Sequence, residues 1–122
     1  MDHSEGFLKI VNDAKTRIRE LSVEQVRAKQ ARKEDFVFVD VREDSEWAKG
    51  HAAGAIHLGK GVIERDVEQA IPDRDREVIL YCGGGFRSAL AADVLQRMGY
   101  VGVFSMDGGI KLWRERGYPT ED

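Results

Sequence analysis

The sequence reads VILYCGGGFRSALAADVLQRM from Val78 to Met98, and this stretch decides the fold class. Residues 78–82 are continuously apolar apart from the tyrosine hydroxyl, which is typical of a strand buried on both faces. Residues 88–98 carry apolar side chains at helical spacing. Three glycines join the two segments. The stretch therefore predicts a buried strand that leads through a tight turn into an amphipathic helix.

Strands and helices alternate on both sides of this stretch. Apolar runs predict further strands over 36–41, 55–58 and 101–105. Helical spacing predicts helices over 5–16, 23–31, 45–49, 62–71 and 110–116. Ser22 and Gln25 form the pattern of a capping box at the start of the second of these helices. Alternating strands and helices imply an α/β fold with a mainly parallel sheet, whose sites open at the carboxyl ends of the strands.

The composition limits the class of protein and its partners. The 122 residues fit one domain, and 42% apolar with 34% charged residues suits a globular protein. The net charge of −3 argues against a nucleic-acid partner. No run approaches the roughly 20 apolar residues of a membrane span, and the first residues lack the pattern of a secretory signal. We therefore expect a cytoplasmic protein with no membrane partner.

Cys82 lies at the carboxyl end of a predicted strand and is the only cysteine, so no disulfide forms within the chain. The glycines after it allow backbone N–H groups to point inward, and the helix that follows adds the positive end of its dipole. Arg87 adds a planar fork of charged donors. Such surroundings favour a cysteine thiolate. We predict Cys82 as the nucleophile, in a substrate-binding loop that consists of Gly83, Gly84, Gly85, Phe86, Arg87 and Ser88.

The segment 82–87, with the sequence CGGGFR, resembles the six-residue active-site loop of rhodaneses. The resemblance extends upstream to the segments 40–43, 46–47, 50–51 and 54–57, and downstream to 107–109 and Trp113. These pieces follow the order of the family and together span about residues 18–119. The resemblance therefore predicts a rhodanese-like domain over 18–122, preceded by an amphipathic helical extension over 1–17.

The resemblance also implies a fold and a reaction. The fold is a central, mainly parallel five-stranded sheet with helices on both faces. In the reaction, a ping-pong sulfur transfer, the Cys82 thiolate takes the outer sulfur of thiosulfate or another sulfane donor and carries it as a persulfide. The expected partners are a small anionic sulfur donor and an external acceptor, which is cyanide, a thiol or a partner protein. We expect no metal or cofactor, and either a monomer or a homodimer.

One departure from the family concerns charge. Well-known thiosulfate-specific rhodaneses often have a cation directly after the cysteine, whereas this chain has Gly83. Arg42, Lys60 or Arg65 are candidates for a second charge, and Asp40 with Arg42 is a candidate support for the site. For Arg42 we favour a structural salt bridge with Glu43 or Glu46. We interpret His51 and His57 as residues that fix loops rather than metal ligands, and Trp47 and Trp113 as core residues.

Two other functions remain as alternatives. A cysteine phosphatase or arsenate reductase on the same fold would carry the pattern C-x₅-R, which requires arginine at the position of Ser88. A non-catalytic interaction or sulfur-carrier module often lacks the cysteine, whereas this chain keeps it. The helix over 5–16 packs on the domain, forms a homodimer or docks a sulfur acceptor, and we favour packing.

Overall fold

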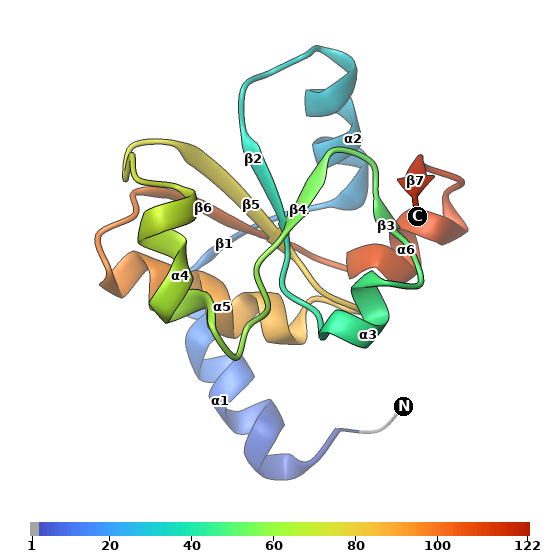
Figure 1. The fold of residues 1–122 in the computed structure, drawn as a ribbon. Helices are drawn as coiled ribbons and strands as arrows, with labels where there is room; N and C mark the ends of the chain where they lie inside the picture. The colour runs from blue at the N-terminus through green and yellow to red at the C-terminus, as the bar shows by residue number, and fades with distance from the viewer. Residues whose placement is uncertain (1–2) are drawn as a thin grey trace.

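The computed structural model describes residues 3–122, which form a central five-stranded parallel sheet with the strand order β1-β6-β5-β2-β4 (Figure 1). The strands of this sheet are β1 (Arg19–Leu21), β2 (Val37–Asp40), β4 (Ala55–His57), β5 (Glu77–Tyr81) and β6 (Gly102–Met106). A small antiparallel pair consists of β3 (His51–Ala52) and β7 (Thr120–Glu121). The helices are α1 (Glu5–Lys15), α2 (Val23–Ala31), α3 (Asp44–Trp47), α4 (Ile63–Ala70), α5 (Phe86–Arg97) and α6 (Gly109–Glu115). Over residues 3–122, no helix has the length and apolar character that a membrane span requires.

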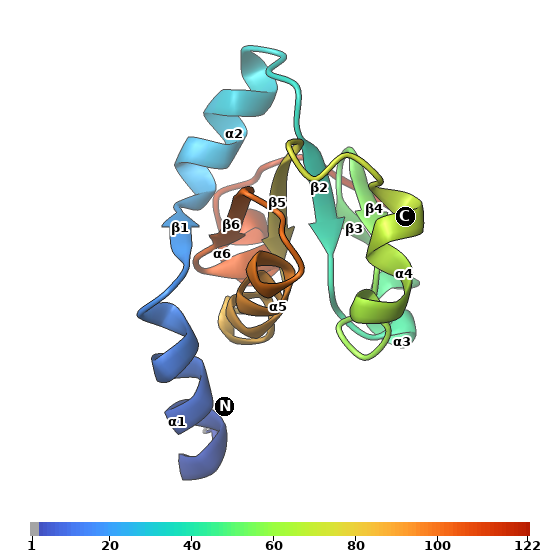
Figure 2. The same cartoon turned by 90° about the vertical axis from the view of Figure 1, so that its left-hand side faces the viewer.

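The central strands are apolar on both sides because each side faces a layer of helices. In β2 and β5, Val39 and Leu80 face the cluster that α4 and α5 complete. Their neighbours Phe38 and Ile79 face the opposite cluster, to which α2 and α6 contribute, with Trp113 fully buried in it. Figures 1 and 2 show helices on both faces of the sheet. The predicted fold class is therefore confirmed.

The predicted elements differ from the observed ones mainly at their ends. The capping box of α2 is present, with the Gln25 N–H donating to Ser22 Oγ at 3.1 Å and the Ser22 N–H donating to Gln25 Oε1 at 2.8 Å. Helix α5 begins at Phe86, two residues before the predicted start. Strand β1 lies outside the predicted set, because it is three residues long with two of them exposed, and no apolar run marks it.

Helix α1 packs against α5 and crosses it at a steep angle, as Figures 1 and 2 show. Its side chains Val11 and Ala14 are buried. Just after the helix, Arg17 donates to both carboxylate oxygens of Asp93 on α5, at 3.0 and 2.8 Å, and Gln96 donates to the Arg17 carbonyl oxygen. Packing on the domain, the favoured prediction for the helix over 5–16, is therefore what the structure shows.

Candidate active site

Cys82 follows Tyr81, the last residue of β5, so its side chain lies at the carboxyl edge of the sheet. Its Sγ accepts hydrogen bonds from the backbone N–H groups of Gly85, at 3.1 Å, and Ser88, at 3.4 Å. The sulfur also lies 3.6 Å from the hydroxyl oxygen of Ser88. Cys82 is only 1% exposed. Because amide donors that point at a sulfur stabilise negative charge on it, this geometry suits a thiolate.

The loop takes this shape because two glycines allow it. Gly85 has φ +103° and is the N-cap of α5, so the chain turns from strand to helix within a few residues. Gly109, the first residue of α6, has φ +56°, and a Cβ there would collide with the carbonyl oxygens of Cys82 and Gly83. Those oxygens accept instead from the backbone N–H groups of Ile110, at 2.9 Å, and Lys111, at 3.1 Å. The start of α6 therefore fixes the carbonyl side of the loop and leaves other loop amides free to face the sulfur.

A second buried hydroxyl stands behind Ser88. Ser105, in β6, lies with its Oγ 2.8 Å from the Oγ of Ser88, and both side chains are fully buried. As a thiol, Cys82 donates to Ser88 Oγ; once Cys82 is a thiolate, the Ser88 hydroxyl can donate to the sulfur while it accepts from Ser105. From the sequence, Ser105 is predicted only as the last residue of an apolar strand over 101–105. Its position in the sequence does indicate a site residue, because a serine near the carboxyl end of a buried strand lies at the sheet edge where sites form.

The pocket outside Cys82 has a volume of about 640 Å³. Its lining residues are His3, Phe7, Glu46, Cys82, Gly83, Gly84, Phe86, Arg87 and Lys111. The predicted candidates for a second charge, Arg42, Lys60 and Arg65, do not line this pocket. Lys111 is the second cation of the lining instead, and its distance from the loop in the sequence hides it, because it lies more than twenty residues downstream of Arg87. It follows the glycine pair 108–109, at the start of the helix that comes after β6.

Arg87 lines the pocket, but its guanidinium is not free there, because Glu46 holds it. Its Nη1 and Nη2 donate to the two carboxylate oxygens of Glu46 at 2.7 and 3.1 Å. The hydrogen bonds from Arg87 lower the pKa of Glu46 to about 2, so Glu46 is ionised at neutral pH. The ion pair therefore persists as pH falls until it approaches that pKa. Any anion that binds Arg87 must share it with Glu46.

Glu46→Gln is expected to lower the KM for thiosulfate, the donor that the resemblance implies, about three- to tenfold, with kcat changed less. The substitution removes a carboxylate that competes for Arg87 and repels an anionic donor, and charge changes near a site act mainly on binding. Steady-state kinetics at low ionic strength measure the effect, which should shrink as salt is added. Because the pair is partly exposed, the stability cost should be small. A higher KM in the variant would show that Glu46 instead holds Arg87 in its binding position.

Asp40 and Arg42 form a buried ion pair with each other, so the predicted partners Glu43 and Glu46 are wrong. Arg42 donates from Nε to both Asp40 oxygens, each at 3.0 Å, and from Nη2 at 2.7 Å. Arg42 also donates to the carbonyl oxygen of Gly50 at 2.8 Å. Neither residue lines the Cys82 pocket. The pair ties the end of β2 to the segment that leads into β3.

Tyr81 completes this network. Its hydroxyl donates to Asp40 Oδ2 at 2.7 Å and accepts from the Ala52 N–H at 3.0 Å. Burial, together with the bond to Asp40, raises the pKa of Tyr81 well above its usual value. The hydroxyl therefore keeps its proton in the folded protein at pH values where an unfolded chain would lose it.

Tyr81→Phe is expected to lower the free energy of unfolding by about 1–3 kcal/mol, because it leaves a buried N–H and a carboxylate oxygen short of a partner. The difference in the free energy of unfolding between the variant and the wild type should narrow above about pH 10. There the unfolded wild-type chain loses the tyrosine proton and the folded protein does not, so the wild type becomes less stable. Urea unfolding across pH 7–11 measures both effects. Tyr118→Phe is the matched control, since its hydroxyl makes no hydrogen bond in the described structure, and should stay within about 0.5 kcal/mol. A pH-independent difference would contradict the assignment of the raised pKa.

Of the two histidines, only His57 makes the predicted loop-fixing hydrogen bond, whereas the buried Nδ1 of His51 has no hydrogen-bond partner among the described residues. His57 Nε2 lies 2.8 Å from the carbonyl oxygen of Arg42. Trp47 stacks on both imidazoles, with centroid distances of 3.5 Å to His51 and 5.0 Å to His57. Trp47 is therefore a half-buried partner of the histidines and not the core residue that we predicted, whereas Trp113 is fully buried. Within residues 3–122, no three His, Cys, Asp or Glu side chains gather as a metal site would require.

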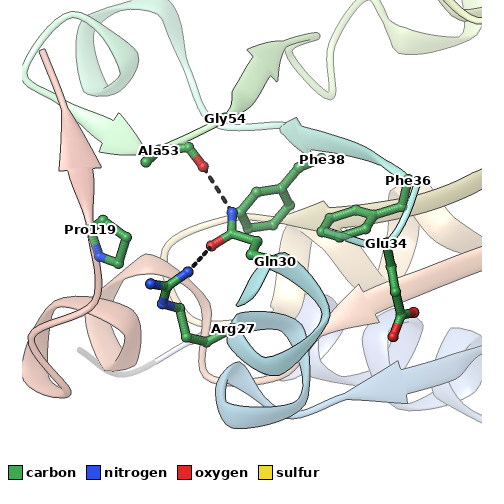
Figure 3. A pocket seen from close by; sticks show the side chains of 8 residues that line it. All are labelled: Arg27, Gln30, Glu34, Phe36, Phe38, Ala53, Gly54 and Pro119. Carbon is green, nitrogen blue, oxygen red and sulfur yellow. Dashed lines mark hydrogen bonds between the residues drawn. The ribbon is translucent and has the colours of Figure 1, made fainter. Parts of the chain in front are cut away.

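A second pocket, of about 390 Å³, lies near the amino end of β2 (Figure 3). Its lining residues are Arg27, Gln30, Glu34, Phe36, Phe38, Ala53, Gly54 and Pro119. Gln30 crosses it to donate to the Ala53 carbonyl oxygen at 2.9 Å and accepts from Arg27 at 3.3 Å. These polar groups thus bond to each other, and the lining contains no nucleophile. The pocket at Cys82 is therefore the candidate active site.

Comparison with known sequences points to the same pocket. The sequence model of the family described as rhodanese-like domain matches residues 22–116, which include the loop and both flanking segments. GlpE of Pseudomonas entomophila, a thiosulfate sulfurtransferase, is 37% identical over 103 residues, which are 84% of this chain and 90% of that protein.

Solved structures share the fold over nearly the whole chain. A Rhodopseudomonas palustris protein, described as of unknown function and a possible tyrosine phosphatase, has a TM-score of 0.84 and 28% identity. The alignment covers 99% of this chain and 98% of that one. The polysulfide-sulfur transferase homodimer of Wolinella succinogenes has a TM-score of 0.80 and 26% identity, over 96% of this chain and 88% of its own.

Proposed function

Because the chain belongs to the rhodanese-like family, we propose that it is a sulfurtransferase that carries sulfane sulfur as a persulfide on Cys82. The donor is thiosulfate or another sulfane compound, and the acceptor is an external thiol, cyanide or a partner protein. The observation that carries this proposal is the pair of backbone N–H groups, from Gly85 and Ser88, that point at the sulfur of the only cysteine. Relatives named thiosulfate sulfurtransferase, at 37–38% identity, support it.

The reaction has two steps. In the first, the Cys82 thiolate attacks the outer sulfur of thiosulfate, a sulfur–sulfur bond forms, and the old sulfur–sulfur bond breaks with its electron pair on departing sulfite. The amides of Gly85 and Ser88 and the Ser88 hydroxyl then stabilise the charge near Cys82. In the second step, the acceptor attacks the outer sulfur of the persulfide and Cys82 leaves as thiolate. Since the chain has no other cysteine, the acceptor comes from outside it.

Three elements give the loop its role in this proposal. Strand β5 delivers Cys82 to the sheet edge, α5 supplies the amide of Ser88, and α6 holds the loop carbonyls. Arg87 and Lys111 attract the anionic donor, with Arg87 shared with Glu46. Asp40 and Arg42 act at a distance, because their ion pair supports the β2 end and does not line the pocket. A free reactive thiol of this kind persists in reducing compartments, which fits a cytoplasmic protein.

A cysteine phosphatase is the main competing function, and one structural neighbour is described in that way. The pattern C-x₅-R would place arginine where this chain has Ser88, whose N–H and hydroxyl face Cys82. The arginine stands one position earlier, so the loop is one residue shorter. A shorter loop suits a single sulfur atom better than a tetrahedral phosphate.

The test is an intact-mass measurement of the full chain. Incubation with thiosulfate should add the mass of one sulfur atom, cyanide should remove it, and prior alkylation of the thiol should prevent it. A parallel assay with a phosphate ester should show negligible turnover. A chain that gains no sulfur from thiosulfate or from other sulfane donors would favour the non-catalytic module, and strong phosphatase turnover would replace the proposal outright.

A further inference from the structure

The first residues that the structure describes reach the Cys82 pocket, although they lie before the segment 22–116 that matches the family. His3 and Phe7 line the pocket together with Phe86 of the active-site loop. The ring centroids are 4.4 Å apart for His3 and Phe86, 5.2 Å for His3 and Phe7, and 6.3 Å for Phe7 and Phe86. These distances are typical of interacting aromatic rings. The three rings form an aromatic wall on one side of the pocket.

Helix α1 holds this wall in place. Val11 and Ala14 are buried against the domain, and the double hydrogen bond of Arg17 to Asp93 fixes the end of the helix. On the pocket side, Lys15 Nζ lies 5.4 Å from the centroid of the Phe86 ring. Since the C-terminal half of α1 is anchored on the domain and Phe7 packs near Phe86, the wall belongs to the folded pocket.

The charges of the pocket complement the aromatic wall. Arg87 is paired with Glu46, so these two contribute little net charge. Among the residues described, Lys111 is the lining cation that makes no ion pair. A dianion such as thiosulfate therefore meets one uncompensated positive charge and an aromatic surface that it cannot use. A monoanion with an apolar group would match both features.

We propose that His3 and Phe7 determine donor selectivity by binding an aromatic group attached to the sulfur donor, an organic thiosulfonate R–SO₂–S⁻. The inference rests on the proposed sulfurtransferase function and names a substrate class for the same site. The Cys82 thiolate attacks the outer sulfur, and the bond between that sulfur and the sulfonyl sulfur breaks with its electron pair. The products are the Cys82 persulfide anion and the sulfinate R–SO₂⁻. Each side carries two negative charges, and no proton or oxidant is needed.

The test compares two donors of equal charge, benzenethiosulfonate and methanethiosulfonate, with cyanide as acceptor. The wild type should have the higher kcat/KM for benzenethiosulfonate. Phe7→Ala should lower the ratio of the two kcat/KM values about tenfold, as expected for the loss of aromatic contacts in an apolar pocket. Phe7→Leu, which keeps apolar volume against α5, should lower it about threefold or less. Ile10→Ala is the matched control, because Ile10 is 52% exposed on the same helix and does not line this pocket.

The outcomes separate this inference from the proposed function. If the wild type accepts both donors equally, or if Phe7→Ala slows both equally, His3 and Phe7 do not select the donor and the inference fails. In that case sulfur loading from thiosulfate would still support the sulfurtransferase. If neither thiosulfonate nor thiosulfate loads Cys82, the function itself fails, and the inference fails with it.

Discussion

Cys82→Ser is expected to reduce sulfur transfer from thiosulfate to cyanide by more than about a thousandfold, because nucleophile removal in covalent catalysis has effects of this size or larger. The replacing hydroxyl is almost identical in shape, so the amides of Gly85 and Ser88 still have an acceptor. It remains protonated at neutral pH, however, and an oxygen attached to a sulfane sulfur is not a stable carrier. The variant should therefore keep the pocket and lose the covalent intermediate.

Two measurements check that the loss of activity comes from the missing thiolate and not from a loss of folding or of anion binding. The free energy of unfolding of Cys82→Ser in urea should stay within about 2 kcal/mol of the wild type, a range typical of point substitutions. Binding of sulfite, the leaving group, should be retained within a few fold, because Arg87 and Lys111 are untouched. Turnover within tenfold of the wild type would mean that sulfur passes directly from donor to acceptor, and the persulfide route would be wrong.

The part of the site that could be predicted from the sequence is the part whose determinants are local. A strand, three glycines and a helix follow one another without interruption around Cys82, so the turn and the helix N-terminus come from neighbouring residues. The capping box at Ser22 is local in the same sense. Local patterns of this kind also carried the resemblance to the family, because its motifs occur in a fixed order. The fold class, which the structure confirms, and the proposed nucleophile therefore both follow from the sequence.

Most contacts of the site that the sequence does not predict join segments far apart in the chain. Glu46 and Arg87 are 41 positions apart, and nothing near Glu46 indicates that it meets Arg87 rather than Arg42. The partner of Arg42 is instead two residues away, because Asp40 and Arg42 are both buried at the end of β2 and a buried charge needs a paired one. The aromatic wall likewise depends on where α1 packs against α5, and helical spacing in the sequence does not specify that position. Which charged residues pair with each other at the sheet edge is therefore decided by the tertiary structure.

Gly109→Ala is expected to destabilise the fold and to disable the site together. A left-handed backbone costs a non-glycine residue roughly 1–2 kcal/mol. The added Cβ also collides with the carbonyl oxygens of Cys82 and Gly83, and overpacking of this kind costs about 1–3 kcal/mol. We therefore expect the free energy of unfolding to fall by about 2–5 kcal/mol. The collision pushes the loop away from α6, and a displacement near 1 Å at reacting atoms can lower turnover about a hundredfold.

Urea unfolding and single-turnover sulfur loading measure the two effects separately. Gly61→Ala is the matched control, because open space surrounds that glycine and it needs no left-handed backbone. Its stability and loading rate should remain within about 0.5 kcal/mol and twofold of the wild type. If Gly109→Ala proves equally harmless, the start of α6 does not shape the loop, and the amides of Gly85 and Ser88 must be aimed at the sulfur by the strand and α5 alone. A stable Gly109→Ala variant with slow loading would instead isolate the contribution of loop position, because the fold would be intact while the donors no longer faced Cys82.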